Sequence, residues 1–173
     1  MIALFYFIVG AGTIVFQTAV AEYFDAWTTA RPDAMILVTL FLGLHRGREA
    51  GLIGGFFLGL LQDALSGGLL GANALLKGLI GHAAGSLKRN VAGRDSIFHG
   101  ALGLFATAFD KVLAVGLTAV FLPDLPIHAN YWLVAGKTIA LNTLLAPLFV
   151  GLLGSAEGRV LPSAAGAPYP ERP

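Results

Sequence analysis

The chain has no cysteine and little charge. Its 173 residues include 11 Lys and Arg and 10 Asp and Glu, with a formal net charge of +1. The lack of cysteine excludes disulfides, thiol catalysis and thiolate metal sites. The basic residues are scattered in ones and twos instead of forming a patch, so the sequence indicates no nucleic-acid partner.

Patterns of common catalytic and metal sites are missing as well. There is no HExxH, GxSxG or P-loop pattern, and no two of the four histidines have the spacing of a metal-ligand pair. We interpret His82 as a packed helix residue and not as a catalytic base. We therefore expect no enzyme activity and no cofactor or metal.

Apolar residues, by contrast, are abundant. They make up 56% of the chain, and the mean hydropathy is +0.76, which predicts an all-α integral membrane protein in a lipid bilayer. Each crossing takes about 20 residues, and the chain fits one six-transmembrane-helix bundle over residues 1–154. The predicted crossings are residues 2–21, 34–44, 51–65, 68–87, 96–122 and 131–153. The second is short, so it must be buried among longer neighbours or lie where the bilayer thins.

The basic residues predict the orientation of the bundle. With six crossings, seven Lys and Arg lie on one side, and Arg31 alone lies on the other. This positive-inside bias places both termini in the cytoplasm. Residues 155–173 hold four of the eight prolines and are rich in alanine, which predicts a disordered cytoplasmic tail. The seven basic residues are Arg46, Arg48, Lys88, Arg89, Arg94, Arg159 and Arg172.

Small residues recur along the third and fourth segments. Gly51, Gly55 and Gly59 are four apart and lie on one face of the third helix, a pattern typical of close helix packing. The fourth segment repeats the pattern, which predicts a tight hairpin between the two. A second interpretation is that the stripe receives a helix of a partner protein. The small residues of the fourth segment are Gly71, Ala74, Gly78, Gly81 and Gly85.

Several ionisable and amide side chains fall within predicted helices. Such groups are costly in the membrane and are expected to face the protein interior or water. Asp110 and Lys111 are adjacent, so their side chains diverge by about 100° and cannot both point at one spot. We therefore expect Asp110 to pair across helices with Lys77 or Lys137. The cluster is interpreted as an electrostatic lock, a ligand or ion pocket, or a set of side chains that reach the interface. Its members are Asn73, Lys77, Asp110, Lys111, Lys137 and Asn142.

Gln62 and Asp63 interrupt the apolar third segment near its end. There the Asp63 carboxylate can be solvated or can accept hydrogen bonds from the following turn. A proton carrier is the other interpretation.

The stretch from residue 31 to about residue 87 resembles the rod shape-determining protein MreD family. The resemblance begins with Pro32 and Asp33, which open the second helix, and continues with a Leu-basic-Gly turn at residues 44–47. A glycine-rich helix then closes on Gly59, Leu60, Leu61 and Asp63, and Gly71 with the letters NALL follows. The tail from Ser155 matches no pattern of the family.

The resemblance implies a non-enzymatic scaffold of the cell-elongation machinery in the bacterial inner membrane. Such proteins bind MreC and work beside MreB, RodA and the penicillin-binding synthase. It also implies a fold like the S-components of vitamin transporters, so the alternative function is a small-molecule-binding subunit of that kind. The Ala-xxx-Ala docking motif of S-components is missing from residues 2–21. As part of the signature, Asp63 is expected to shape its turn and to contribute to a partner surface.

Overall fold

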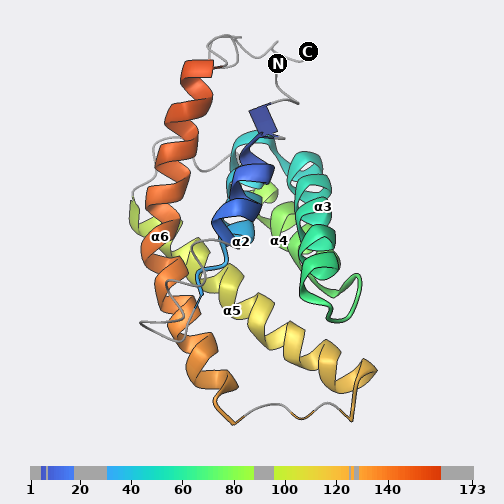
Figure 1. Cartoon of the computed structure of the whole chain (residues 1–173). Helices are drawn as coiled ribbons and strands as arrows, with labels where there is room; N and C mark the ends of the chain where they lie inside the picture. The colour runs from blue at the N-terminus through green and yellow to red at the C-terminus, as the bar shows by residue number, and fades with distance from the viewer. Residues whose placement is uncertain are drawn as a thin grey trace, which may run out of the picture.

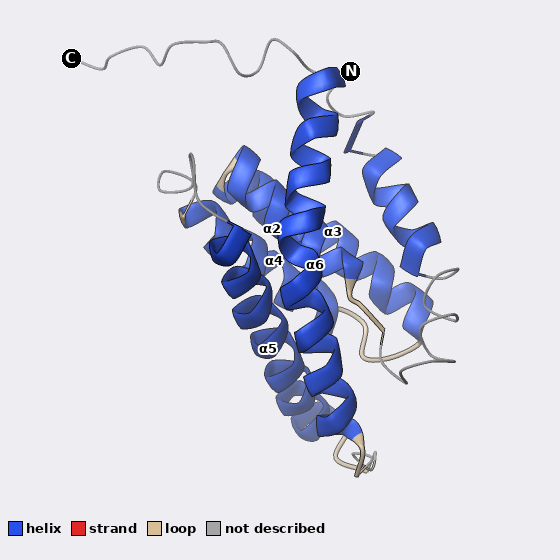
Figure 2. Cartoon of the chain, turned by 90° about the vertical axis from the view of Figure 1, so that its left-hand side faces the viewer, coloured by secondary structure: helices blue, strands red, loops and turns tan. Residues whose placement is uncertain are grey.

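The computed structural model describes residues 5–6, 8–17, 31–87, 96–124, 126 and 129–160, and this part of the chain contains helices and no strand. A short helix, Ile8–Gln17, comes first. Five longer elements follow (Figure 1; Figure 2): α2 Ala34–Arg46, α3 Arg48–Ser66, α4 Ala72–Ser86, α5 Ser96–Phe121 and α6 Tyr131–Val160. The predicted all-α architecture is confirmed.

Helix α2 lies at the centre of the bundle. Every residue from Ala34 to Leu44 is buried, and α3, α4, α5 and α6 all contact this helix. Its 13 residues span about 20 Å, which is less than a hydrocarbon core of about 30 Å. The expectation that this short segment is buried among longer neighbours is confirmed.

Helices α3 and α4 form a hairpin in which backbone meets backbone. A Cβ atom added to Gly51, Gly55 or Gly59 would come within 3.0 Å of α4 main-chain atoms. Because α4 occupies this stripe, there is no room along it for a helix of another protein. The stripe is an intramolecular contact, and the partner interpretation of these three glycines is corrected accordingly.

Two of the small residues of the fourth segment, Gly71 and Gly78, do not make such a close backbone contact. A Cβ on Gly78 would meet the nearest atom of Leu52 at 3.4 Å, an ordinary separation. Gly71 lies in the turn before α4 with a φ of 94°, and a Cβ there would meet nothing within 4 Å. Its role is the left-handed backbone conformation, which glycine adopts without steric cost.

Helices α5 and α6 are the two described helices that are long and apolar enough to cross a membrane. They approach closely where Gly103 faces the main chain of Asn142, and they diverge toward the connection between them (Figure 1). Helix α2 and the helix Ile8–Gln17 are apolar but shorter.

The end of α6 lies beyond the predicted domain boundary. The helix continues to Val160, so residues 155–160 are helical and do not belong to the predicted disordered tail. The extension has a local cause, because Glu157 contacts Tyr6 and Arg46 and residues 148–161 contain no proline. Residues 161–173 of that tail lie outside the described residues.

The helix ends fall into two groups at opposite ends of the bundle. Arg46, at the end of α2, pairs with Glu157 near the end of α6, and Gly85 of α4 packs on Arg48 at the start of α3. Asp63, near the end of α3, contacts the start of α4 at the opposite end. The ends of α2, α4 and α6 thus lie with the start of α3, and the end of α3 lies with the start of α4. This arrangement agrees with the order of crossings that the basic residues predict.

Candidate functional site

The site begins with Asp33, which caps helix α2 from inside the bundle. Its Oδ1 accepts a hydrogen bond from the backbone N–H of Ile36 at 3.2 Å. The backbone N–H of Asp33 donates to Asn142 Oδ1 at 3.0 Å, and that of Ala34 donates to Gln17 Oε1 at 3.1 Å. The first turn of α2 is therefore held by side chains from the N-terminal helix and from α6.

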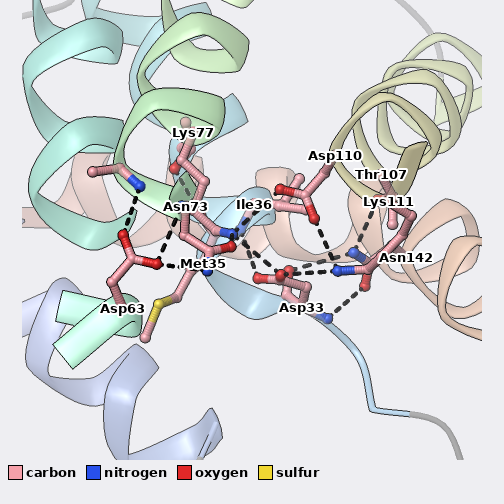
Figure 3. Close-up of polar contacts among 12 residues, drawn as sticks. Asp33, Met35, Ile36, Asp63, Asn73, Lys77, Thr107, Asp110, Lys111 and Asn142 are labelled. Atoms are coloured by element: carbon pink, nitrogen blue, oxygen red, sulfur yellow. Dashed lines mark hydrogen bonds and ion pairs between the residues drawn. The ribbon is translucent and has the colours of Figure 1, made fainter. Parts of the chain in front are cut away.

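Two lysines and two aspartates meet at this point (Figure 3). Lys77 Nζ lies 3.3 Å from Asp33 Oδ2 and 3.6 Å from Asp110 Oδ1. Lys111 Nζ lies 2.8 Å from Asp110 Oδ2 and 3.7 Å from Asp33 Oδ2. The Lys77 side chain is completely buried, whereas that of Lys111 is 21% exposed.

The four charges sum to zero. A buried charge without a partner is strongly unfavourable, and pairing with further hydrogen bonds offsets that cost. Lys77 also donates to Asn73 Oδ1 at 3.3 Å. Asn142 Nδ2 donates to Thr107 Oγ1 at 3.0 Å, and this amide also contacts the main chain of Asp33. The network thus joins α4, α5 and α6 to the start of α2.

Asp63 extends the network to α3. Its Oδ2 accepts from the backbone N–H groups of Gly71 at 2.9 Å and Ala74 at 3.2 Å. Its Oδ1 accepts from Asn73 through the backbone N–H at 3.2 Å and the side chain at 2.8 Å. The N-cap of α4 is Gly71, which has no side chain to offer, so α3 supplies the carboxylate that satisfies the free N–H groups there.

The sequence left open whether the Asp63 carboxylate is solvated or accepts hydrogen bonds from the following turn, and its surroundings distinguish between the two. Its side chain accepts hydrogen bonds from the following turn, and the residue is only 2% exposed. Solvation therefore does not explain this carboxylate.

Five residues of the predicted polar cluster meet in the network, and the predicted pairing of Asp110 with Lys77 is present. Lys137 is not part of the contacts described above. The expectation that Asp110 and Lys111 cannot point at one spot was wrong, because the long Lys111 side chain bends back to Asp110. The five are Asn73, Lys77, Asp110, Lys111 and Asn142.

Sequence reasoning missed Asp33 and Thr107 as members of the network. Asp33 was identified through the family resemblance, as a residue that opens the second helix, and it was not included in the polar cluster. A Pro-Asp pair directly before an apolar run is also an N-cap signal, and this signal pointed to its hydrogen bond with Ile36. Thr107 gave no signal, since a lone threonine in an apolar helix usually bonds to its own helix.

A pocket of about 290 Å³ lies beside the ion pairs. Its wall includes Asp33 and Lys111, and it also includes Gln62, whose Oε1 is buried with no hydrogen-bond partner among the described residues. Tyr131 donates from its hydroxyl to the Lys111 carbonyl at 2.9 Å. Among the described residues, no three His, Cys, Asp or Glu side chains gather as a metal site requires. The lining residues are Gln17, Arg31, Asp33, Gln62, Lys111, Tyr131, Val134, Ala135 and Thr138.

A family comparison covers nearly all of the helical chain. The sequence model of rod shape-determining protein MreD matches residues 1–155. The chain belongs to the MreD family. The match reaches well beyond the stretch from residue 31 to about residue 87, and it implies a role in rod-shape determination. Comparison with curated proteins and with solved structures found no match.

Membership of the MreD family favours the first of the two functions considered from the sequence. The family consists of shape-determining structural membrane proteins. The two span-length apolar helices agree with a membrane location. The geometry of the site agrees as well, because its charges neutralise one another and its amides hold helix ends.

Proposed function

We propose that this protein is a non-enzymatic scaffold of the bacterial cell-elongation machinery that binds MreC in the inner membrane. Through MreC it would act with MreB and with the RodA and penicillin-binding peptidoglycan synthases. The observation that carries the proposal is the MreD family match over residues 1–155. In this proposal the six helices cross the bilayer with an S-component-like arrangement, and both termini are cytoplasmic.

The buried network supports a scaffold because it fixes the relative positions of the helices. Sliding one helix against its neighbours would separate Lys77 from Asp33 or Asp110, which are its partners from two other parts of the chain. Leaving such a charge unpaired in the interior is strongly unfavourable. A single stable arrangement presents a constant surface, which is what a protein that holds a partner needs.

The α3–α4 turn is the part of that surface that we assign to partner binding. Asp63 is buried and therefore acts on a partner through the turn, whose residues Gly67, Gly68 and Leu70 are exposed. Leu70 is 71% exposed at a helix end, and the hydrogen bond from Gly71 to Asp63 fixes the backbone directly after it.

The test is co-purification of the tagged full chain with MreC from bacterial membranes in mild detergent. We expect MreC to be recovered with the native chain and with Asp124→Ala, a control that alters the exposed turn after α5. We expect Leu70→Ser to lower MreC recovery at unchanged membrane level, because it changes the surface without touching Asp63.

Two results would count against the proposal. Absence of MreC from every preparation would overturn the scaffold function itself. Full recovery with Leu70→Ser would remove the turn from the partner surface and leave MreC binding to another face.

A further inference from the structure

Two pockets of the bundle differ in the chemistry of their walls. The pocket along α4 and α5, of about 780 Å³, is lined by apolar side chains apart from His82. The pocket of about 290 Å³ beside the ion pairs is the reverse, because seven of its nine described lining residues carry a polar or charged side chain. In a bilayer the apolar wall suits lipid chains, whereas the polar wall suits water.

One polar atom of the wall is available to a molecule in the pocket. Gln62 lines the pocket, and its Oε1 is buried with no hydrogen-bond partner among the described residues. A buried acceptor of this kind costs free energy unless a donor reaches it. A water molecule supplies such donors and occupies about 30 Å³ in the liquid, so about 290 Å³ holds roughly ten of them.

The ion-pair network gives this pocket no excess of charge. Lys111 Nζ lies 2.8 Å from Asp110 and 3.7 Å from Asp33 (Figure 3), and the four charges of the network sum to zero. The Lys111 side chain is nevertheless 21% exposed, whereas that of Lys77 is completely buried. The network therefore meets the pocket through Lys111, and a partly exposed ionisable side chain at membrane depth is expected to face water.

The exposure of the wall indicates where the pocket opens. Arg31 is exposed, whereas Asp33 and Thr138 are buried, and all three line the pocket. The mouth thus lies on the side of Arg31 and of Tyr131, the first residue of α6. The basic residues predict that this end of the bundle faces away from the cytoplasm, so the pocket would open to the outer side.

We propose that this pocket is a water-filled vestibule, open to the outer side of the membrane, that gives small hydrophilic solutes access to the ion pair of Lys111 and Asp110. Its volume admits solutes as large as roughly ten water molecules and excludes a helix of another protein. The inference is independent of the scaffold function, because it rests on the pocket and not on the family match.

The test uses single cysteines, because the native chain has none. Thr138→Cys places a thiol on the pocket wall. Gly136→Cys and Ala140→Cys are the controls, at exposed positions four residues apart on one face of α6. They lie on either side of Thr138 along the helix, so a rate set by depth alone would place Thr138→Cys between them.

The reaction is followed in bacterial membranes with two membrane-impermeant methanethiosulfonates, one bearing a sulfonate and the other a trimethylammonium group. Each is added to spheroplasts, which expose the outer side, and to inside-out vesicles, which expose the cytoplasmic side. We expect Thr138→Cys to react from the outer side about tenfold or more faster than both controls, because a charged reagent is strongly disfavoured in hydrocarbon. Reagents of both charges should show this order.

A second substitution in the Thr138→Cys chain locates the route. Val134→Phe places a ring in the pocket and should slow the reaction by about tenfold or more, because the ring takes the volume that the reagent needs. Leu133→Phe places the same ring on the neighbouring side chain, which is 62% exposed, and should leave the rate unchanged. The comparison of the three cysteines decides the matter even if Val134→Phe fails to fold.

Three outcomes would contradict the inference. A rate at Thr138→Cys that does not exceed both controls would show that the pocket is not hydrated. Faster reaction from the cytoplasmic side would show that it does not open outward. Equal rates with Val134→Phe and Leu133→Phe would place the route elsewhere. MreC recovery is a separate measurement, so the failure of this inference and the failure of the scaffold proposal are distinguishable.

Discussion

The α3–α4 hairpin and the α5–α6 pair are held together in different ways. In the first, glycines let two backbones touch along the helices from Gly51 to Gly59. In the second, close approach is limited to Gly100 and Gly103 of α5, while a Cβ on Gly116 or Gly136 would meet nothing within 4 Å. The first hairpin is therefore a rigid unit, and the second presents long apolar faces to its surroundings.

The difference shows why the polar network lies where it does. Two helices without a continuous glycine contact need another means of fixing their position against the rest of the bundle. Asp110 of α5 and Asn142 of α6 provide it by bonding to Lys77 of α4 and to Asp33 at the start of α2. The ion pairs join the two hairpins, whereas the glycines hold only one of them.

The largest loss of stability is expected from removing Lys77, whose ion pairs join the two hairpins. Lys77→Met leaves Asp33 and Asp110 with Lys111 as their shared cation, and we expect a loss of about 3–5 kcal/mol in unfolding free energy. Denaturant titration of the purified protein in detergent measures it. Adding Asp110→Asn restores charge balance and should recover part of the loss. A double variant no more stable than Lys77→Met would show that charge balance is not the cause.

Gly55 and Gly136 provide a direct contrast between the hairpins. Gly55→Ala places a methyl against the Lys77 carbonyl of α4, and overpacking of this kind costs about 1–3 kcal/mol. Gly136→Ala adds the same methyl in open space and should be neutral or stabilising by up to about 1 kcal/mol, because alanine favours the helix. Thermal unfolding of the two variants under identical conditions tests the contrast, and equal shifts would contradict it.

Substitutions at the α3–α4 hairpin and in the α5–α6 connection should also differ in their effect on stability and hydrogen exchange. Asp63→Ala removes the cap of α4 and leaves the N–H groups of Gly71, Asn73 and Ala74 without this acceptor. We expect a loss near the upper end of the usual cap value, about 2 kcal/mol. Hydrogen exchange at these amides should accelerate. Asp124→Ala, in the exposed connection of α5 and α6, should change neither measurement.

The smallest loss of stability is expected from weakening the ion pair that joins the end of α2 to the end of α6. The Arg46–Glu157 pair is partly exposed, and such pairs contribute about 1 kcal/mol or less. Glu157→Gln should therefore lower stability only slightly. The loss should shrink further in 1 M salt, where the screening length is about 3 Å. A loss that salt does not change would contradict an ion-pair origin, because glutamine retains an Oε1 that can still accept from the Tyr6 hydroxyl.

Local patterns in the sequence determined much of this protein. Hydropathy predicted helical segments close to α2, α3, α4, α5 and most of α6, and the four-residue spacing of Gly51, Gly55 and Gly59 predicted the close hairpin. The ordered motifs from Pro32 to Gly71 pointed to the family that the match over residues 1–155 shows. Each of these depends on residues that are near one another in the chain, so spacing alone reveals them.

The site depended on contacts that spacing does not encode. Asp33 and Asn142 are 109 residues apart, and Asp33 became buried only because α2 starts inside the bundle. The pairing of Asp110 with Lys111 was misjudged from helix geometry, since the flexible lysine chain turns toward whichever acceptors its neighbours supply. The sequence determined which helices form and which residues are costly to bury. The tertiary structure alone decided which of those residues neutralise one another, because that depends on which helices are neighbours and at what depth.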